Sequence, residues 1–272
     1  MRIKITAIVL GVVRHSDTRS VATLYTPDRG RLTCVVPVAQ RRGRSSRVPL
    51  LPLSIIEADI NFRPAQQLQM LSSYSPARVW RSIYVNPAKM AVATFISEFL
   101  MRLLRDSQPD APTWTFIERS LMLLDSAGSG TEHSLRGRHA VANFHLVFTA
   151  SLASFAGIQP DLTHYSPDAP FDMLSGTYLP PAAINRTGMG YGLNATGTKK
   201  GMVAGNDTHL LMPPAAALPR MLARLSYSTA ARLPLSGETR YRILEGILRY
   251  YSYHFPGMST LRSHHILREV FA

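Results

Sequence analysis

Cysteine is almost absent from this sequence of 272 residues, in which Cys34 is the single example. One thiol cannot form a disulfide within the chain, and it excludes zinc sites built from several cysteines. Cys34 alternates with Leu32 and Val36, so we interpret it as a buried apolar residue of a strand. The adjacent His264 and His265 would point about 100° apart on a helix and could not share a metal ion. We therefore expect no metal site and no cofactor.

Acidic residues are scarce as well. The chain carries 30 Lys and Arg against 17 Asp and Glu, a formal net charge of +13. The excess is uneven: the net charge is +8 over residues 1–80, +1 over residues 81–160 and +4 over residues 161–272. So large a positive charge indicates a polyanionic partner, either nucleic acid or an anionic membrane surface.

Long apolar runs are missing too. Crossing a bilayer takes about 18 or more consecutive apolar residues, and no stretch of the sequence approaches that length. The first apolar run covers only residues 7–13, is rich in β-branched residues and is followed by no small-residue cleavage site. We interpret it as a strand rather than a signal peptide, and we expect a cytoplasmic protein with no membrane partner.

Five short segments with strand-like patterns occupy the first 80 residues. Alternating or continuous apolar runs predict strands over residues 2–14, 19–26, 30–38, 49–62 and 66–74. Five strands in about 75 residues, with no helical period, favour a five-stranded oligonucleotide-binding (OB) barrel over residues 1–80. An SH3-like barrel or a small sandwich remains the alternative.

The second and third predicted strands form a hairpin that leads into an arginine-rich loop. Residues 40–47 contain four arginines, with glycine and serine and no acidic residue. Guanidinium groups without acidic partners suit a nucleic-acid backbone. Tyr25 falls opposite Leu24 by alternation, so its ring could stack on bases from the outer face, although core packing is the alternative. The candidate DNA-binding residues are Arg14, Arg19, Arg29, Arg31, Arg41, Arg42, Arg44, Arg47 and Tyr25.

Helical periodicity begins at Asn86 and Pro87, a cap and a first helical residue. We predict a helical domain over residues 81–272, so that the fold class is α+β with two domains. The first helix is expected to begin at Pro87. Further helices are expected over residues 114–124, 138–155, 215–225, 238–253 and 261–271. Residues 160–212 lose all period and are interpreted as an irregular insert.

Motifs that would indicate an enzyme are weak. The segment from Gly192 to Lys200 is similar to a phosphate-binding loop, but Thr198 stands where a Walker A motif has its lysine. A metal-dependent nuclease would need an acidic cluster, and Glu57 and Asp59 are the only close pair in the barrel. We therefore expect no catalytic residues.

The order of several segments resembles the bacterial RecO family of recombination mediators. These segments are the hairpin from Asp17 to Thr26 with Gly30 behind it, the helix from Phe95 to Leu104, Phe144 with Gly157 and Pro160, and the closing run from Leu261 to Phe271. The likeness covers nearly the whole chain. Many members carry a four-cysteine zinc site after the position of Pro160, and this chain has no cysteine there. The resemblance therefore brings no metal.

The resemblance implies a non-enzymatic DNA repair and recombination protein of the nucleoid. Such proteins bind single- and double-stranded DNA, anneal complementary strands and, with RecR, help load recombinase onto DNA coated by the single-stranded-DNA-binding protein, SSB. A general RNA- or nucleic-acid-binding OB module, acting in translation or RNA metabolism, is the competing interpretation.

The resemblance also implies contact with the C-terminal tail of SSB, which is acidic and ends in an apolar residue and a free carboxylate. A ligand of this kind needs arginines beside an apolar slot. The candidate residues are Arg119, Arg136, Arg138 and Phe144. The alternative is that the arginines are ordinary solvated residues at a helix start.

Overall fold

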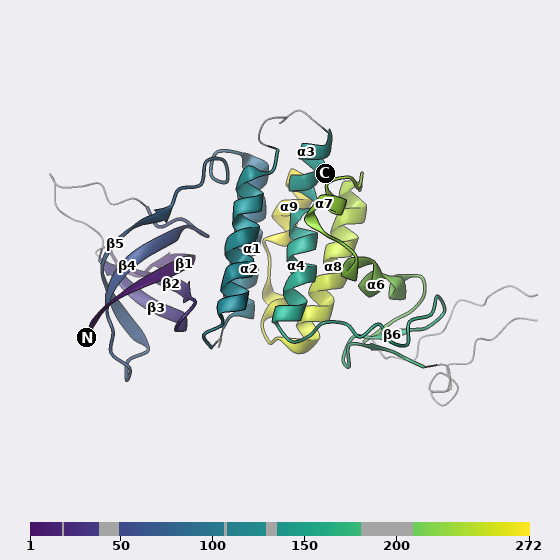
Figure 1. Cartoon of the computed structure of the whole chain (residues 1–272), viewed down its shortest axis with the longest axis horizontal. Coiled ribbons are helices and arrows are strands. Elements are labelled where there is room, and N and C mark those ends of the chain that lie inside the picture. Colours follow the sequence, from purple (N-terminus) through teal and green to yellow (C-terminus); the bar gives the residue numbers. More distant parts are fainter. Residues whose placement is uncertain (18, 38–48, 106–107, 129–134, 181–208) are drawn as a thin grey trace, which may run out of the picture.

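The computed structural model describes residues 1–17, 19–37, 49–105, 108–128, 135–180 and 209–272. A β-barrel comes first in the chain and a larger helical part follows it (Figure 1). The last barrel strand ends at Arg78 and the first helix begins at Pro87. The expected α+β class, with the barrel before the helices, is confirmed.

The barrel is built from five strands that close on themselves. They are β1 (Arg2–Arg14), β2 (Arg19–Thr26), β3 (Gly30–Pro37), β4 (Ile55–Asn61) and β5 (Leu68–Arg78). Their order around the barrel is β1-β2-β3-β5-β4, and β4 pairs with β1 to complete the ring. All neighbours are antiparallel except β3 and β5, which run parallel. Closure leaves few backbone groups unpaired at strand edges.

Two strands, β4 and β5, differ from their expected bounds by several residues. The strand expected over residues 49–62 begins only at Ile55, because Leu53 has a φ of +63°, a left-handed conformation that an extended strand does not contain. The Leu53 carbonyl instead accepts a hydrogen bond of 3.0 Å from the Trp80 indole. Strand β5 is longer than expected and continues to Arg78.

Alternation along β2 and β3 divides their side chains between two cores. Leu24 and Cys34 lie in the barrel core, whereas Tyr25 belongs to a larger core shared with the helices. Burial raises the pKa of the Cys34 thiol to about 12, so the thiol stays protonated. The expectation that Cys34 is a buried apolar residue is confirmed.

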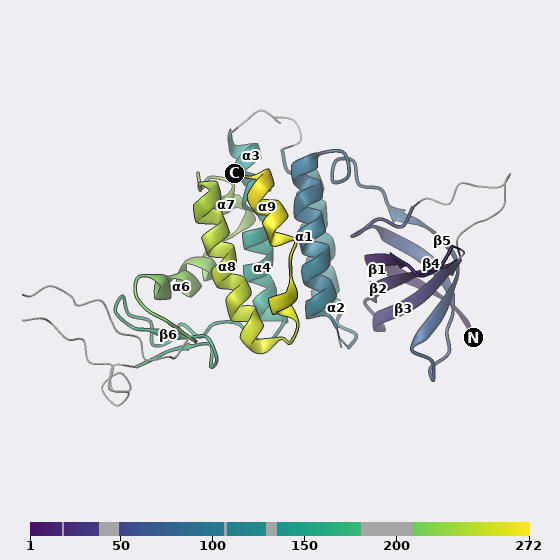
Figure 2. The same cartoon turned by 180° about the vertical axis from the view of Figure 1, so that it is seen from behind.

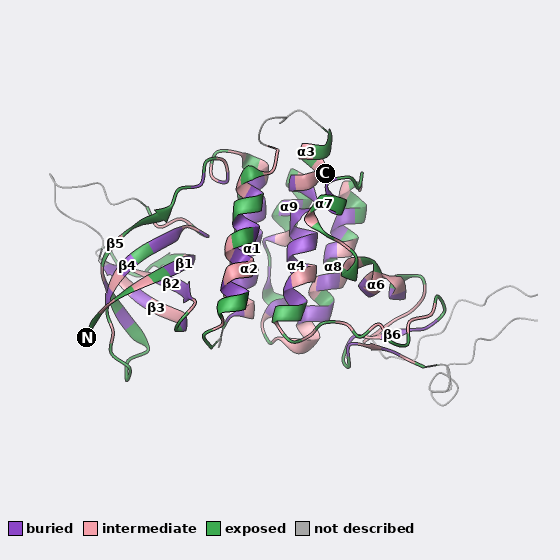
Figure 3. Cartoon of the chain, in the orientation of Figure 1, coloured by how far each residue is buried: buried purple, intermediate pink, exposed green. Residues whose placement is uncertain are grey.

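The helical part packs around α4, which is buried along most of its length (Figure 3). Its helices are α1 (Pro87–Leu103), α2 (Ala111–Ser126), α3 (Leu135–Ala142), α4 (Phe144–Phe155), α6 (Leu218–Ala223), α7 (Tyr227–Ala230), α8 (Gly237–His254) and α9 (His264–Val270), with two 3-10 turns, η1 (Ala215–Ala217) and η2 (Met258–Thr260). Seen from behind, α9 lies between α1 and α8 (Figure 2). Within the described residues, no helix combines the length and the apolar character needed to cross a membrane.

The start of α1 follows the sequence pattern. The Asn86 side chain accepts a hydrogen bond of 3.1 Å from the Lys89 amide, and Pro87 occupies the first helical position. The helix expected over residues 138–155 is instead two helices, because Asn143 interrupts it. The Asn143 amide donates to the carbonyls of Ala230 and Leu233, both at 2.9 Å. A tertiary contact therefore decides this boundary.

The C-terminal part is not entirely helical. A small three-stranded sheet in the order β7-β6-β8 is made by β6 (Phe171–Asp172), β7 (Thr177–Tyr178) and β8 (Leu210–Leu211). Within the described parts of residues 160–212, these two-residue strands are the regular structure, and the other described residues there form turns and irregular segments. Phe171 and Tyr178 are buried there in a separate apolar cluster with Tyr250 of α8.

Candidate functional site

One end of the barrel gathers exposed basic side chains. Arg14 and Arg19 flank the turn between β1 and β2, and the Arg19 carbonyl accepts hydrogen bonds of 3.0 Å from the amides of His15 and Ser16. The Arg14 guanidinium lies 2.9 Å from the exposed carboxylate of Asp17. Ion pairs as exposed as this one are weak and remain open to competition from another anion.

The arginine-rich loop leaves the barrel at this same end, because Pro37, the last residue of β3, pairs with Arg19. Arg41, Arg42, Arg44 and Arg47 themselves lie outside the described residues. Pro37, the described residue that precedes this segment, is thus at the same barrel end as Arg14 and Arg19.

Arg29 lies at the opposite end of the hairpin. It belongs to the turn between β2 and β3, where its guanidinium lies 4.4 Å from the centre of the Phe62 ring. The eight residues of β2, at about 3.4 Å each, separate this turn from Arg19 by more than roughly 20 Å. Arg29 is exposed but does not join the arginines at the other end.

Tyr25 is buried and not available to DNA, which corrects one expected contact, whereas Arg31 is half-buried and already donates a hydrogen bond. Both lie on the outer side of the barrel, as the alternation of Tyr25 with Leu24 suggested, but α1 and α2 cover this side. Tyr25 is 0% exposed, and its ring centre lies 6.1 Å from that of Trp114. The Arg31 guanidinium donates a hydrogen bond of 2.8 Å to the Met101 carbonyl in the last turn of α1. These side chains join the two parts of the molecule.

The acidic pair of the barrel is not arranged as a metal site. Asp59 accepts hydrogen bonds from the Ser73 hydroxyl and the Arg2 guanidinium, which lower the pKa of its carboxyl group. Glu57, two residues before it, is exposed. Within the described ranges, no three His, Cys, Asp or Glu side chains are grouped so that they could hold a metal ion.

A second candidate site is a cleft of about 500 Å³ in the helical part, which we call the basic cleft. The first turns of α1 and α8 open onto it at Ala88 and Gly237, and Arg138 and His139 of α3 line it. Helix N-termini carry unpaired amide groups and partial positive charge. The apolar lining is Val141, Ala142, Leu235, Val270 and Phe271. Anionic and apolar parts of one ligand could therefore both be accommodated.

Two buried cations, Lys89 and Arg240, are part of the lining of the basic cleft. Lys89 is 2% exposed, and its ammonium group donates to the Ser82 hydroxyl and the Asp125 carbonyl at 2.7 and 2.9 Å. Arg240 is 7% exposed and donates to the Asn143 side chain and to the carbonyls of Leu235 and Phe271. These hydrogen-bond acceptors of Arg240 are all neutral oxygens. None of the described lining residues has an acidic side chain.

The positive charge of Arg240 also affects the pKa of His145. Burial, together with the positive charge of Arg240, lowers the pKa of the His145 imidazole to about 3. His145 is therefore neutral near pH 7 and does not contribute to the positive potential. Burial likewise lowers the pKa of the Arg240 guanidinium from its ordinary value.

The four residues expected to hold an SSB tail are only partly brought together. Arg138 lines the basic cleft, and Arg136 is exposed two residues before it on α3. Phe144 is 2% exposed and stacks on Tyr227 with ring centres 4.6 Å apart, so it cannot form an open slot. Arg119 is exposed on α2 and is not part of the cleft lining. The apolar lining comes from Phe271 instead of Phe144.

Sequence reasoning missed Lys89 and Arg240. Neither was among the candidate site residues, because the sequence does not show which cations of a helix become buried. Lys89 is buried against Ser82 and the end of α2, and Arg240 is buried against Asn143 and the last residues of the chain. The asparagine and serine caps at the starts of α1 and α8 were the available signal, because they mark the helix ends that open onto the basic cleft.

The comparisons with known proteins agree over almost the whole chain. Residues 1–80 match the model for the N-terminal region of recombination protein O, and residues 85–263 match the model for its C-terminal region. The DNA repair protein RecO of Phocaeicola vulgatus is 27% identical over 270 residues, which cover 99% of each chain. Those of Bacteroides fragilis and Flavobacterium psychrophilum are 28% and 23% identical, covering 98% and 100% of each chain. The chain therefore belongs to the recombination protein O family.

Proposed function

We propose that this protein acts in DNA repair and recombination by binding single- and double-stranded DNA through its barrel. Its place in the family supports this proposal, as does the name of its relatives, DNA repair protein RecO. The finer steps of the proposal are annealing of complementary strands and, together with RecR, loading of recombinase onto SSB-coated DNA. This work is non-enzymatic and takes place at the nucleoid.

One observation carries the DNA-binding part of the proposal. The end of the barrel with Arg14 and Arg19 is also the end from which the loop with four arginines departs, in the most positively charged third of the chain. Phosphate contacts from arginine give affinity without reading sequence. Tyr25, the one aromatic residue assigned to stacking, is buried. The binding of DNA is therefore expected to be mainly electrostatic.

The salt dependence of DNA affinity tests this mechanism. Contacts with four to six phosphates predict a slope of log K against log salt of roughly −3 to −4 on single strands. Replacing Arg14 and Arg19 together by alanine removes two phosphate contacts and should make the slope shallower by about 1.4. A charge-matched control replaces the exposed Arg242 and Arg268 of the helical part, and it should leave the slope unchanged.

A comparison of strand annealing with DNA and with RNA of the same sequence separates the two classes of nucleic-acid partner. Annealing of DNA strands, but not of RNA strands of the same sequence, supports the repair function. Equal activity on both would favour a general nucleic-acid-binding module instead. A slope near zero on DNA would contradict the electrostatic mechanism for either class.

We also propose that the basic cleft binds the acidic C-terminal tail of SSB. Arg138 and the starts of α1 and α8 would hold carboxylates, and the apolar lining that includes Phe271 would take the last side chain. A tail peptide with an amidated C-terminus should bind more weakly than the same peptide with a free carboxylate. Equal binding of the two peptides would mean that the terminal charge is not recognised there.

A further inference from the structure

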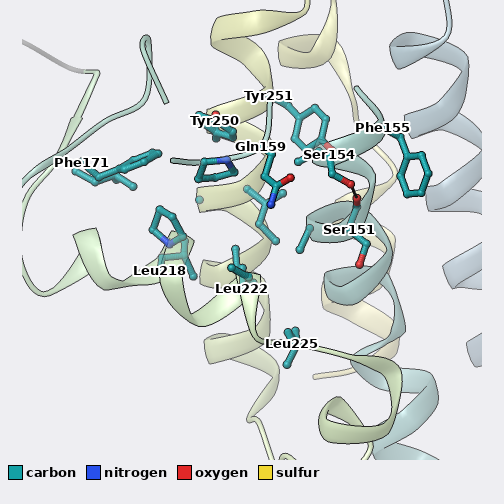
Figure 4. Close-up of a pocket in the computed structure, with 18 residues that line it drawn as sticks. Ser151, Ser154, Phe155, Gln159, Phe171, Leu218, Leu222, Leu225, Tyr250 and Tyr251 are labelled. Carbon is teal, nitrogen blue, oxygen red and sulfur yellow. Dashed lines mark hydrogen bonds between the residues drawn. The ribbon is translucent and has the colours of Figure 1, made fainter. Parts of the chain in front are cut away.

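An apolar cavity of about 260 Å³ lies between α4, α6 and α8 (Figure 4), and it shares no lining residue with the basic cleft. Its floor on α4 is made of small residues, among them Ala150 and Ala153, and Phe171 of β6 closes one side. Gly246 of α8 lets α6 approach closely, since a Cβ atom there would come within 2.7 Å of the Leu218 side chain. Short side chains on two helices thus leave a space that α6 covers only in part.

Among the residues that the structure describes, no charged side chain lines this cavity. Most of the polar groups at its wall are already engaged: the Ser154 hydroxyl donates to the Ser151 carbonyl, and the hydroxyls of Tyr250 and Tyr251 donate to the carbonyls of Ile158 and Thr149. Placing a carboxylate or phosphate here without a cation would carry a large desolvation cost. The cavity therefore suits an uncharged ligand and differs in chemistry from the basic cleft.

Gln159 gives the cavity a hydrogen-bonding edge. Its side-chain amide is exposed, extends among the lining side chains in Figure 4, and pairs with no other group in the described part of the chain. A primary amide offers one acceptor and two donors, which complement the N–H and C=O of a peptide group. An apolar ligand that presents a peptide group at this edge would satisfy it.

Size and surroundings distinguish a peptide from a free small molecule. A cavity of about 150 Å³ is enough for benzene, so about 260 Å³ accommodates one phenyl or indole group with part of a backbone. Apolar surface is also exposed at the cavity wall, because the lining residue Phe155 is 39% exposed. Exposed apolar surface around a pocket is typical of protein–protein contacts. A small molecule inside the cavity would leave it uncovered.

We propose that this cavity binds a bulky apolar side chain from a partner protein, within an uncharged stretch whose peptide group pairs with Gln159. The site is separate from the proposed DNA and SSB-tail sites, so a ligand bound here leaves the barrel end and the basic cleft open. Its recognition differs as well, because an internal segment of a chain fits it and a free terminal carboxylate does not.

The test uses N-acetyl-tryptophanamide as a neutral mimic of such a side chain with its peptide groups. Titration into the full-length protein should shift the methyl NMR signals of Ile247 and Leu222, which line the cavity, and leave Leu71 of the barrel core unchanged. Gln159→Ala should weaken binding about five-fold, the equivalent of one hydrogen bond. The control Gln67→Ala, at an exposed position of the barrel, should bind like the unaltered protein.

Two further probes identify what the cavity recognises. N-acetyl-tryptophan, which carries a carboxylate, should bind about ten-fold more weakly than the amide. Filling the space with Ala153→Leu should abolish the shifts, and the exposed Gln159→Ala variant provides a readout if the core variant does not fold. The proposal is overturned if the amide causes no shifts, or if amide and acid bind equally. It is also overturned if free indole, used as a third probe, binds as tightly as the amide and its binding is unaffected by Gln159→Ala.

Discussion

At the scale of single residues, the arginines of this chain differ in role because they contact different groups. Arg29 and Arg31 are two positions apart in the sequence, but Arg29 is exposed at a turn while Arg31 is bonded to the end of α1. Spacing within a basic stretch could not distinguish them, because the helix that receives Arg31 comes 70 residues later. Tyr25 was misassigned for the same reason: its side of the barrel is the outer one, and a later helix covers it.

Arg31→Ala is expected to lower the free energy of unfolding by about 1–2 kcal/mol, because a partly buried, charge-assisted hydrogen bond to the Met101 carbonyl is lost. Urea denaturation measures the change. Arg29→Ala is the matched control and should change stability by less than about 0.5 kcal/mol. An unchanged free energy of unfolding in Arg31→Ala would mean that Arg31 does not join the barrel to the helices.

Glu98 of α1 predicts a specific acid sensitivity. Burial raises the pKa of its carboxyl group, but hydrogen bonds from Ser263, Arg102 and Arg262 outweigh burial and bring the pKa down to about 2. Since the pKa is lower in the folded state than the unfolded value of about 4.3, its contribution to stability is complete above that value and is lost as the pH falls toward 2.

Glu98→Gln should therefore flatten the dependence of unfolding free energy on pH between about 5 and 2. Urea denaturation at a series of pH values provides the comparison. Glu57→Gln, at an exposed strand position, is the control and should keep the slope of the unaltered protein. An identical slope in Glu98→Gln and the unaltered protein would show that this carboxylate does not hold the start of α9.

At the scale of elements, local signals predicted the starts of helices better than their continuity. The Asn86 cap and Pro87 at the start of α1 could be read directly, because both act on backbone groups within four residues. The break between α3 and α4 could not be predicted from local sequence, because asparagine is compatible with a helix. The side chain of Asn143 is instead bonded to carbonyls almost 90 positions away. The small sheet was missed because strands of two residues show no periodicity.

Asn143→Ala should destabilise the protein by about 3 kcal/mol, since it leaves the Arg240 guanidinium and two carbonyls with lost partners in a buried site. The measurement is urea unfolding followed by circular dichroism. Asn61→Ala, at an exposed position at the end of β4, should have little effect. A loss below about 1 kcal/mol for Asn143→Ala would mean that this contact does not join α4 to α8.

At the scale of the whole molecule, composition and order predicted more than any single motif. The charge excess in the first 80 residues, the five strands and the helical remainder together indicated a nucleic-acid-binding barrel followed by a helical part. The basic cleft could not be foreseen, because it forms where the starts of α1 and α8 meet α3. The sequence indicated basic and apolar residues near Arg138 but not which of them share a surface.

We propose that the barrel end binds DNA and that the basic cleft binds an acidic tail. Both activities can be measured in parallel on Arg14→Ala/Arg19→Ala and on Arg136→Ala/Arg138→Ala, with annealing of naked single strands as one readout and binding of an SSB tail peptide as the other. We predict that the barrel variant loses annealing and keeps peptide binding, and that the cleft variant does the reverse. If the cleft variant loses naked-DNA annealing while peptide binding is unchanged, the assignment of the two surfaces is contradicted.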